Sequence, residues 1–129
     1  MSQTNAIEVK NLVKTYGDVY ALKNVDLNIA DGEYFVLLGP SGGGKTTLLR
    51  SIGGFIRPDS GSVDIKGQNV DNLPPDKRPT SMVFQGFALF PHMSVSENIG
   101  YGLKIQSIEN NIIENNGKRW VCYWSARFV

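Results

Sequence analysis

The sequence has few of the features that mark secreted or membrane-embedded proteins. It contains a single cysteine, so no internal disulfide can form and a reducing compartment fits. Its first residues, MSQTNAIEVK, lack both the basic and the apolar region of a signal peptide. No apolar run approaches the roughly 20 residues that span a bilayer. We therefore expect a soluble protein whose work at a membrane, if any, goes through a partner.

The sequence also lacks an excess of either acidic or basic residues. The 13 basic residues are balanced by 12 acidic ones, which leaves a formal net charge of +1 without any run of like charges. A broad nucleic-acid-binding surface is therefore not supported, whereas a local phosphate site is compatible with this balance. The length of 129 residues fits one small domain or a piece of a larger one.

Alternation of apolar and polar residues predicts an antiparallel pair of strands near the N-terminus. Residues 7–9 and 12–16 form the first extended stretch, which ends at a Gly17-Asp18 turn. Residues 19–29 form the second, and they place apolar side chains on one face with a period of two.

The following elements alternate between strand and helix signals. Residues 34–38 are a continuous apolar run, which predicts a strand buried on both faces. Apolar residues at helical spacing predict a helix over 45–55, and short strands are expected at 63–65 and 82–84. A second helix is expected over 94–105, where Ser94 and Glu97 have the spacing of a capping box.

The most specific motif lies between the apolar run and the first helix. Residues 39–46, GPSGGGKT, satisfy the phosphate-binding-loop (P-loop) pattern G-x-x-x-x-G-K-[ST]. Glycines let backbone N–H groups turn toward a polyphosphate, and the helix start adds unpaired N–H groups and a positive dipole end. Lys45 can reach the β- and γ-phosphates, and the Thr46 hydroxyl can ligate Mg²⁺. The alternative is a glycine-rich turn without a ligand.

Together these elements predict an α/β fold. We expect a P-loop NTPase (RecA-like) core that is joined to an antiparallel β-subdomain formed by residues 6–30 and 61–70.

Three segments carry a resemblance to a known family. LLGPSGGGKTTLLR, PPDKRPTSMVFQ and ALFPHMSVSENIGYGLK follow one another in the order and spacing of the ATP-binding subunits of ABC transporters. Over residues 6–106 the sequence is most similar to importers of the polyamine, ferric-iron and sugar group. The resemblance implies that the chain binds ATP and Mg²⁺ and powers solute uptake, with polyamine as the first choice of solute and ferric iron as the second.

The resemblance also implies a set of site residues. Tyr16 would stack on adenine, Thr47 would bond the α-phosphate, and Gln85 would contact Mg²⁺ and the attacking water. Lys45 and Gln85 are the catalytic candidates, and Thr46 and Gln85 the metal-binding ones. The nucleotide-binding candidates are Tyr16, Gly39, Ser41, Gly42, Gly43, Gly44, Lys45, Thr46 and Thr47. Without the resemblance, Tyr16 is interpreted as an ordinary hairpin aromatic and Gln85 as a surface residue.

A further segment resembles the surface on which such subunits meet the transmembrane permease subunits. It contains Phe87, Leu89, Phe90, Pro91 and His92. The alternative is that its three large apolar side chains belong to the core. The implied partners are the permease subunits and a second ATP-binding subunit, without nucleic acid, and the implied location is cytoplasmic, at the inner face of the cell membrane.

Motifs that the family uses for hydrolysis are missing from the sequence. There is no run of four apolar residues that ends in Asp-Glu, no L-S-G-G-Q, and His92 does not match the catalytic histidine of the family. We therefore expect residues 1–106 to be the N-terminal part of a nucleotide-binding domain. Residues 107–129 are expected to be a divergent tail, as from a shifted reading frame, or else a purposeful tail of a natural short protein.

Two functions remain as hypotheses from the sequence. One is the ATP-binding, energy-coupling subunit of an importer, and the other is a C-terminally truncated fragment that binds nucleotide without hydrolysing it. An unrelated P-loop kinase or GTPase is disfavoured by the segment MVFQGFALFPHM.

Overall fold

The structure, a computed structural model, describes residues 5–105 of the chain. The expected tail at 107–129 lies outside these residues. The chain divides after Met82 into two compact units, which are described separately below.

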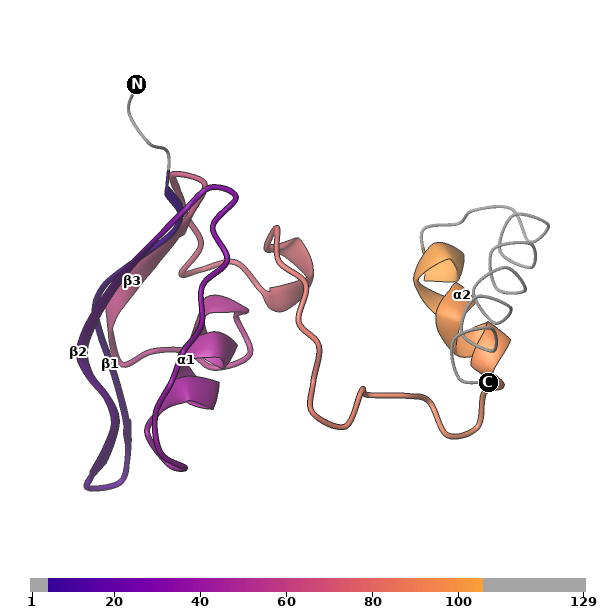
Figure 1. The fold of residues 1–129 in the computed structure, drawn as a ribbon, viewed down its shortest axis with the longest axis horizontal. Coiled ribbons are helices and arrows are strands. Elements are labelled where there is room, and N and C mark those ends of the chain that lie inside the picture. Colours follow the sequence, from indigo (N-terminus) through magenta and orange to yellow (C-terminus); the bar gives the residue numbers. More distant parts are fainter. Residues whose placement is uncertain (1–4, 106–129) are drawn as a thin grey trace. The chain divides into compact units, whose positions relative to one another are not determined.

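The first unit is an antiparallel sheet with one helix beside it (Figure 1). The strand order is β2-β1-β3-β4, so that β1 pairs with both β2 and β3. The elements are β1 (Asn5–Tyr16), β2 (Val19–Ala30), α1 (Lys45–Ile52), β3 (Ser60–Ile65), β4 (Gln68–Asn69) and the 3₁₀ turn η1 (Pro75–Lys77). The predicted β-subdomain and its Gly17-Asp18 turn are therefore confirmed.

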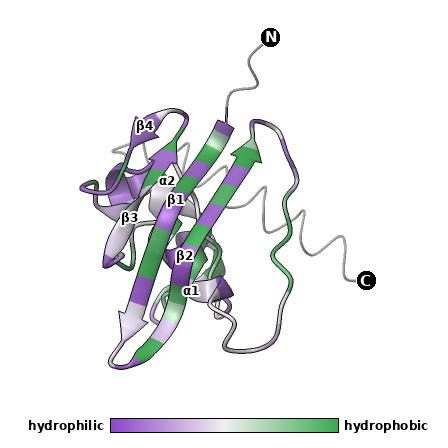
Figure 2. Ribbon diagram, turned by 90° about the vertical axis from the view of Figure 1, so that its left-hand side faces the viewer, coloured by the Kyte–Doolittle hydropathy of each residue, from purple (hydrophilic) through white to green (hydrophobic). Residues whose placement is uncertain are grey.

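Alternating side chains of the sheet form the core together with α1. Figure 2 shows this alternation along β1 and β2, where hydrophobic and hydrophilic residues follow one another. Leu48 and Ile52 of α1 pack against the apolar face of the sheet. The buried apolar cluster consists of Val9, Leu12, Leu22, Leu48, Ile52, Val63, Ile65 and Val70.

The C-terminal end of α1 is held by a buried arginine. Arg78 is only 7% exposed, and its Nη1 donates hydrogen bonds to the carbonyl oxygens of Ser51 and Ile52, each at 2.9 Å. Its Nε donates to the carbonyl oxygen of Leu73 at 2.9 Å. The last carbonyl groups of a helix have no intrahelical partner and carry the negative end of its dipole. Arg78 thus satisfies them with a cation, although burial lowers the pKa of its guanidinium.

Two of the expected strands are wrong for the described residues. Residues 33–40 and 81–84 belong to no strand of the structure, and the side chains of Tyr34 and Leu38 are 92% and 89% exposed. A strand exists only where a neighbouring strand accepts and donates its ladder hydrogen bonds. Among residues 5–105 no parallel neighbour pairs with either segment. The apolar run at 34–38 predicts burial, but in the structure only Leu37 of these five residues packs against the core.

The second unit contains α2 (Val95–Ile105), which begins at the predicted capping box. The Ser94 Oγ and backbone N–H both donate to Glu97 Oε2 at 2.7 Å, and the Glu97 N–H donates to Ser94 Oγ at 3.3 Å. The Asn98 Oδ1 accepts a hydrogen bond from the N–H of Phe90, which fixes the preceding loop on the helix. Within residues 5–105, no helix has the length and apolar character that crossing a membrane requires.

We expect Arg78→Met to lower the free energy of unfolding by about 2 to 3 kcal/mol, because buried carbonyl groups lose their donor. Urea denaturation of the full chain measures this change. Arg57→Met is the matched control, since Arg57 is exposed and lines the same small cavity as Arg78. It should change the stability by no more than about 0.5 kcal/mol. Equal losses in the two variants would contradict a special role for Arg78.

Candidate nucleotide-binding site

The P-loop forms a hollow at the N-terminal end of α1. A cavity of about 290 Å³ is lined by residues 41–47 together with Ala21 of β2. The Gly43 N–H donates to the carbonyl oxygen of Pro40 at 3.1 Å and closes the turn. The site residues predicted between Ser41 and Thr47 therefore share one cavity, and Gly39 lies just before it.

The helix start gives this cavity a positive potential. The first N–H groups of an α-helix have no intrahelical partner, and the helix dipole places its positive end there. The first turn of α1 contains no acidic residue that would compensate this field. Backbone N–H groups and the dipole together favour an anion at such a position.

Lys45 adds a full positive charge at the same place. Its Nζ donates hydrogen bonds to the carbonyl oxygens of Gly39 and Pro40, at 2.7 and 2.6 Å. Both acceptors are neutral, so they orient the ammonium group without cancelling its charge. A polyphosphate would offer charged acceptors instead, which form stronger hydrogen bonds with an ammonium group.

Gly44 allows the loop and the hairpin to meet closely. It precedes α1 with a φ of 78°, in the left-handed region. A Cβ atom at this position would collide with the carbonyl oxygen of Ala21 and lie 3.1 Å from Leu22 Cδ2. On the β2 side of the cavity, Ala21 therefore approaches the loop so closely that only a glycine fits at position 44.

Tyr16 lies on the hairpin whose second strand supplies Ala21 to the cavity. It is the last residue of β1, pairs with Val19 and is 53% exposed. The Nζ of Lys14 lies 5.7 Å from the centroid of its ring, within the range of a cation–π contact. Its exposure fits a ring that receives a ligand, and stacking on adenine remains a prediction.

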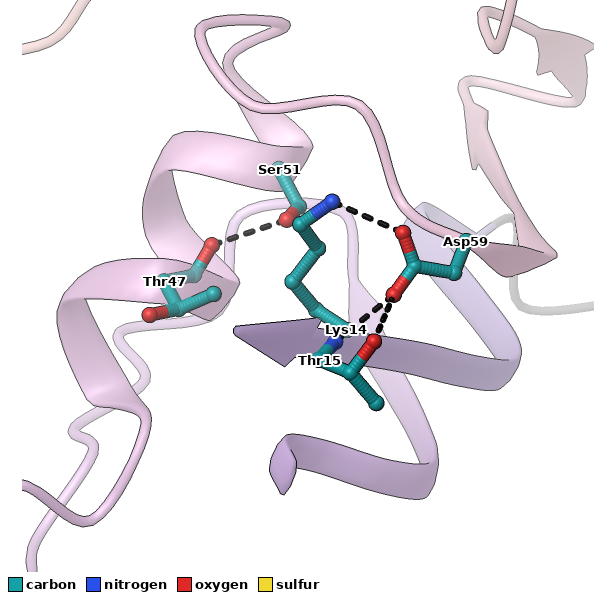
Figure 3. Close-up of polar contacts among 5 residues, drawn as sticks. All are labelled: Lys14, Thr15, Thr47, Ser51 and Asp59. Carbon is teal, nitrogen blue, oxygen red and sulfur yellow. Dashed lines mark hydrogen bonds and ion pairs between the residues drawn. The ribbon is translucent and has the colours of Figure 1, made fainter. Parts of the chain in front are cut away.

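An acidic residue that the sequence analysis missed ties this hairpin end to the segment after α1. The carboxylate of Asp59 accepts hydrogen bonds from the N–H and Oγ1 of Thr15 and from Lys14 Nζ (Figure 3). Figure 3 also shows Ser51 Oγ donating to the carbonyl oxygen of Thr47 at 2.8 Å, within α1. The contacts from Lys14 and Thr15 lower the pKa of Asp59 to about 2, so the group is ionised at neutral pH.

The remaining candidates belong to the second unit. Gln85 is exposed at the start of a turn, and its contact with a nucleotide remains a prediction. Phe87 and Leu89 are 72% and 66% exposed, as a docking surface requires. Phe90 instead packs its ring against Tyr101, with 4.5 Å between the centroids.

A family model described as "ABC transporter" matches residues 22–125, which is most of the chain. The chain belongs to the ABC transporter family. This confirms the resemblance inferred from the P-loop and the two segments that follow it. The residues expected to form a tail are included in part in the matched range.

Several curated relatives with similar sequences are named as ATP-binding proteins of spermidine/putrescine import. The spermidine/putrescine import ATP-binding protein PotA of Nitratidesulfovibrio vulgaris is 54% identical over 102 residues, which cover 79% of this chain and 28% of that protein. The protein of the same name from Roseobacter denitrificans is 55% identical over 101 residues, which cover 78% of this chain and 28% of that protein. The chain thus spans somewhat more than a quarter of the length of these ABC relatives.

Solved structures confirm the ABC cassette fold. The dimeric post-hydrolysis structure of the ATP-binding cassette MJ0796, bound to ADP and Pi, has a TM-score of 0.78 and 33% identity. The match covers 88% of this chain and 54% of that one. A second dimeric structure of MJ0796, a bacterial ABC transporter cassette, gives a TM-score of 0.76 at 35% identity, over 84% of this chain and 53% of that one.

We expect Gly44→Ala to destabilise the chain more than Gly42→Ala does. Both glycines have a φ near 80°, so both variants carry strain of about 1 to 2 kcal/mol. Only at Gly44 does the added Cβ collide with backbone, which should cost at least about 1 kcal/mol more. Urea denaturation of the two variants measures the difference, and equal losses would show that β2 does not press on the loop.

Proposed function

We propose that this chain is the ATP-binding, energy-coupling part of an ABC importer and that it holds Mg-ATP in the cavity at residues 41–47. The observation that carries the proposal is the junction of three anion-binding features. Glycine-rich backbone, the N-terminus of α1 and the Lys45 ammonium group meet at one cavity. The names of the curated relatives favour a polyamine as the imported solute.

Most of the predicted residues have a distinct role in this proposal. The N–H groups of residues 42–45 and the Lys45 ammonium bind the β- and γ-phosphates, and Thr47 bonds the α-phosphate. Tyr16 stacks on the adenine. Gln85 would contact the metal ion and the attacking water.

Mg²⁺ fits the residues that line the cavity. Among residues 5–105, no group of three His, Cys, Asp or Glu side chains forms a metal site of its own. Mg²⁺ commonly takes few protein ligands and completes its octahedron with water and phosphate oxygens. Thr46 lines the cavity, and its hydroxyl is a ligand of this kind. Bound there, the ion would neutralise charge on the phosphate oxygens.

A second candidate function is a fragment that binds nucleotide without hydrolysing it. It is favoured by the lack of an Asp-Glu pair after an apolar run and of L-S-G-G-Q in the sequence. Phosphoryl transfer depends on a metal ion held in place and on an oriented water molecule. If the chain releases phosphate from ATP and Lys45→Ala loses this activity, the energy-coupling enzyme is supported. If the chain binds ATP without releasing phosphate, the nucleotide-binding fragment is supported.

We expect Lys45→Ala to abolish detectable Mg-ATP binding in isothermal titration calorimetry, because the cation that meets the β- and γ-phosphates is removed. Tyr16→Ala should weaken binding by about 1 to 3 kcal/mol, the usual contribution of base stacking. Lys77→Ala and Tyr20→Ala are the matched controls, since both residues are exposed and lie outside the cavity lining. Unchanged ATP affinity in Lys45→Ala would refute the proposed site.

The proposal includes docking on transmembrane permease subunits. Phe87 and Leu89 expose large apolar side chains in the second unit, and exposed apolar clusters commonly mark partner sites. Phe87, Leu89, Phe90, Pro91 and His92 form the proposed docking segment. In this arrangement the chain is cytoplasmic, lies at the inner face of the membrane and works beside a second ATP-binding subunit.

Leu89→Asp should reduce solute uptake by the assembled importer by about tenfold or more while Mg-ATP affinity stays unchanged, because a charge enters an apolar interface. Solute uptake into vesicles and nucleotide titration measure the two properties. Val95→Asp is the control, since Val95 is similarly exposed at the first position of α2. Loss of ATP affinity in Leu89→Asp would show that the residue stabilises the fold instead.

A further inference from the structure

The carboxylate of Asp59, the residue just before β3, binds residues at the end of β1. Asp59 accepts hydrogen bonds from the Thr15 N–H at 2.7 Å, from Thr15 Oγ1 at 2.8 Å and from Lys14 Nζ at 2.8 Å. Its own N–H donates to the carbonyl oxygen of Val13 at 2.9 Å. Three consecutive residues of β1, those just before Tyr16, are thus fixed by Asp59, and Figure 3 shows the contacts with Lys14 and Thr15.

We propose that Asp59 is a positioning residue for base recognition, which holds the Tyr16 ring ready for adenine by fixing Lys14 and Thr15. The inference rests on the proposed function, because it assumes that the chain binds ATP. It assigns a role in the nucleotide site to a residue that does not line the cavity.

The backbone at Tyr16 needs this support because the sheet is irregular there. The pairing of β1 with β2 shifts register between Lys14 and Thr15, one position before Tyr16. The pairing of β1 with β3 ends at Val13, so β3 gives Tyr16 no ladder partner. Asp59 Oδ2 accepts hydrogen bonds from both the N–H and the Oγ1 of Thr15, and so holds the backbone at the point where the register of the β1–β2 pairing shifts.

Lys14 extends the contact to the ring itself. Its Nζ is bound to Asp59 Oδ1 and lies 5.7 Å from the centroid of the Tyr16 ring. The Lys14 side chain is 18% exposed, so most of its surface is covered by its surroundings. The carboxylate thereby orients a cation that in turn contacts the aromatic ring.

A fixed ring binds a base more tightly than a mobile one. A half-exposed tyrosine at a strand end has several rotamers, and a ligand that stacks on it must select one of them. Fixing the ring beforehand removes that cost from the binding step. Phosphate contacts depend on the loop at 41–47 and do not use Tyr16, so the effect should be confined to ligands that carry a base.

The test compares ATP with inorganic tripolyphosphate, which has the phosphates without the base. In calorimetric titrations with Mg²⁺, Asp59→Ala should weaken ATP binding about fivefold or more, the lower limit of a stacking contribution. Tripolyphosphate affinity should remain within about twofold, since that ligand makes no stacking contact. In the Tyr16→Ala background, Asp59→Ala should cause no further loss of ATP affinity, because the two residues act through the same contact.

Two further variants control for charge and for folding. Asp18→Asn also removes a carboxylate from this hairpin, at the exposed turn after Tyr16, and should leave ATP affinity within about twofold. Thr15→Val removes only the Oγ1 donor and should lower ATP affinity in the same selective way, though less than Asp59→Ala does. Thr15→Val therefore tests the positioning role of Asp59 if the Asp59→Ala variant does not fold.

Three results would overturn the inference. Equal losses for ATP and tripolyphosphate would show that Asp59 only stabilises the fold, and unchanged ATP affinity would show that it does not act on Tyr16. Both results leave the proposed function intact if ATP binding still depends on Lys45. ATP binding that is absent or independent of Lys45 would refute the proposed function, and this inference with it.

Discussion

The candidate site depends on the packing of α1 against the β-sheet. The helix has eight residues, and helices of that length are not stable alone in water because nucleation is costly. Burial of Leu48 and Ile52 among the apolar side chains of the sheet contributes about 1.5 to 3 kcal/mol for each residue. Arg78 completes the helix at its C-terminal end. The N–H groups that face the cavity are positioned only because the rest of the helix is held in this way.

The electrostatic arrangement of the P-loop follows from that packing. The helix dipole, the glycine-rich backbone and the Lys45 ammonium group meet at one cavity, and Lys45 donates to two neutral carbonyl groups there. Together these groups favour a ligand with several negative charges. The hairpin adds the second half of the proposed site, since Ala21 borders the loop and Tyr16 ends the first strand.

The sequence predicted the features that depend on local patterns. Alternation along residues 19–29 gave β2, the spacing of Ser94 and Glu97 gave the start of α2, and residues 39–46 gave the P-loop. It failed at residues 34–38, because an apolar run indicates burial but not whether a partner strand is present. Asp59 and Arg78 were missed for another reason. Lys14 and Thr15 lie 45 and 44 residues from Asp59, and Ser51 and Ile52 lie 27 and 26 residues from Arg78. No periodicity or motif indicates contacts over such separations.

The most direct test of the account is residue-specific NMR of the ¹⁵N-labelled chain during titration with Mg-ATP. Nucleotide binding at the P-loop should cause saturable shifts of the amide resonances of Gly43, Gly44, Lys45 and Thr46, together with shifts of the Tyr16 ring signals. Tripolyphosphate should reproduce the shifts of the loop but not those of the ring. Shifts that are absent from residues 43–46, or that appear only outside the cavity lining, would contradict the claim that this P-loop is a nucleotide site.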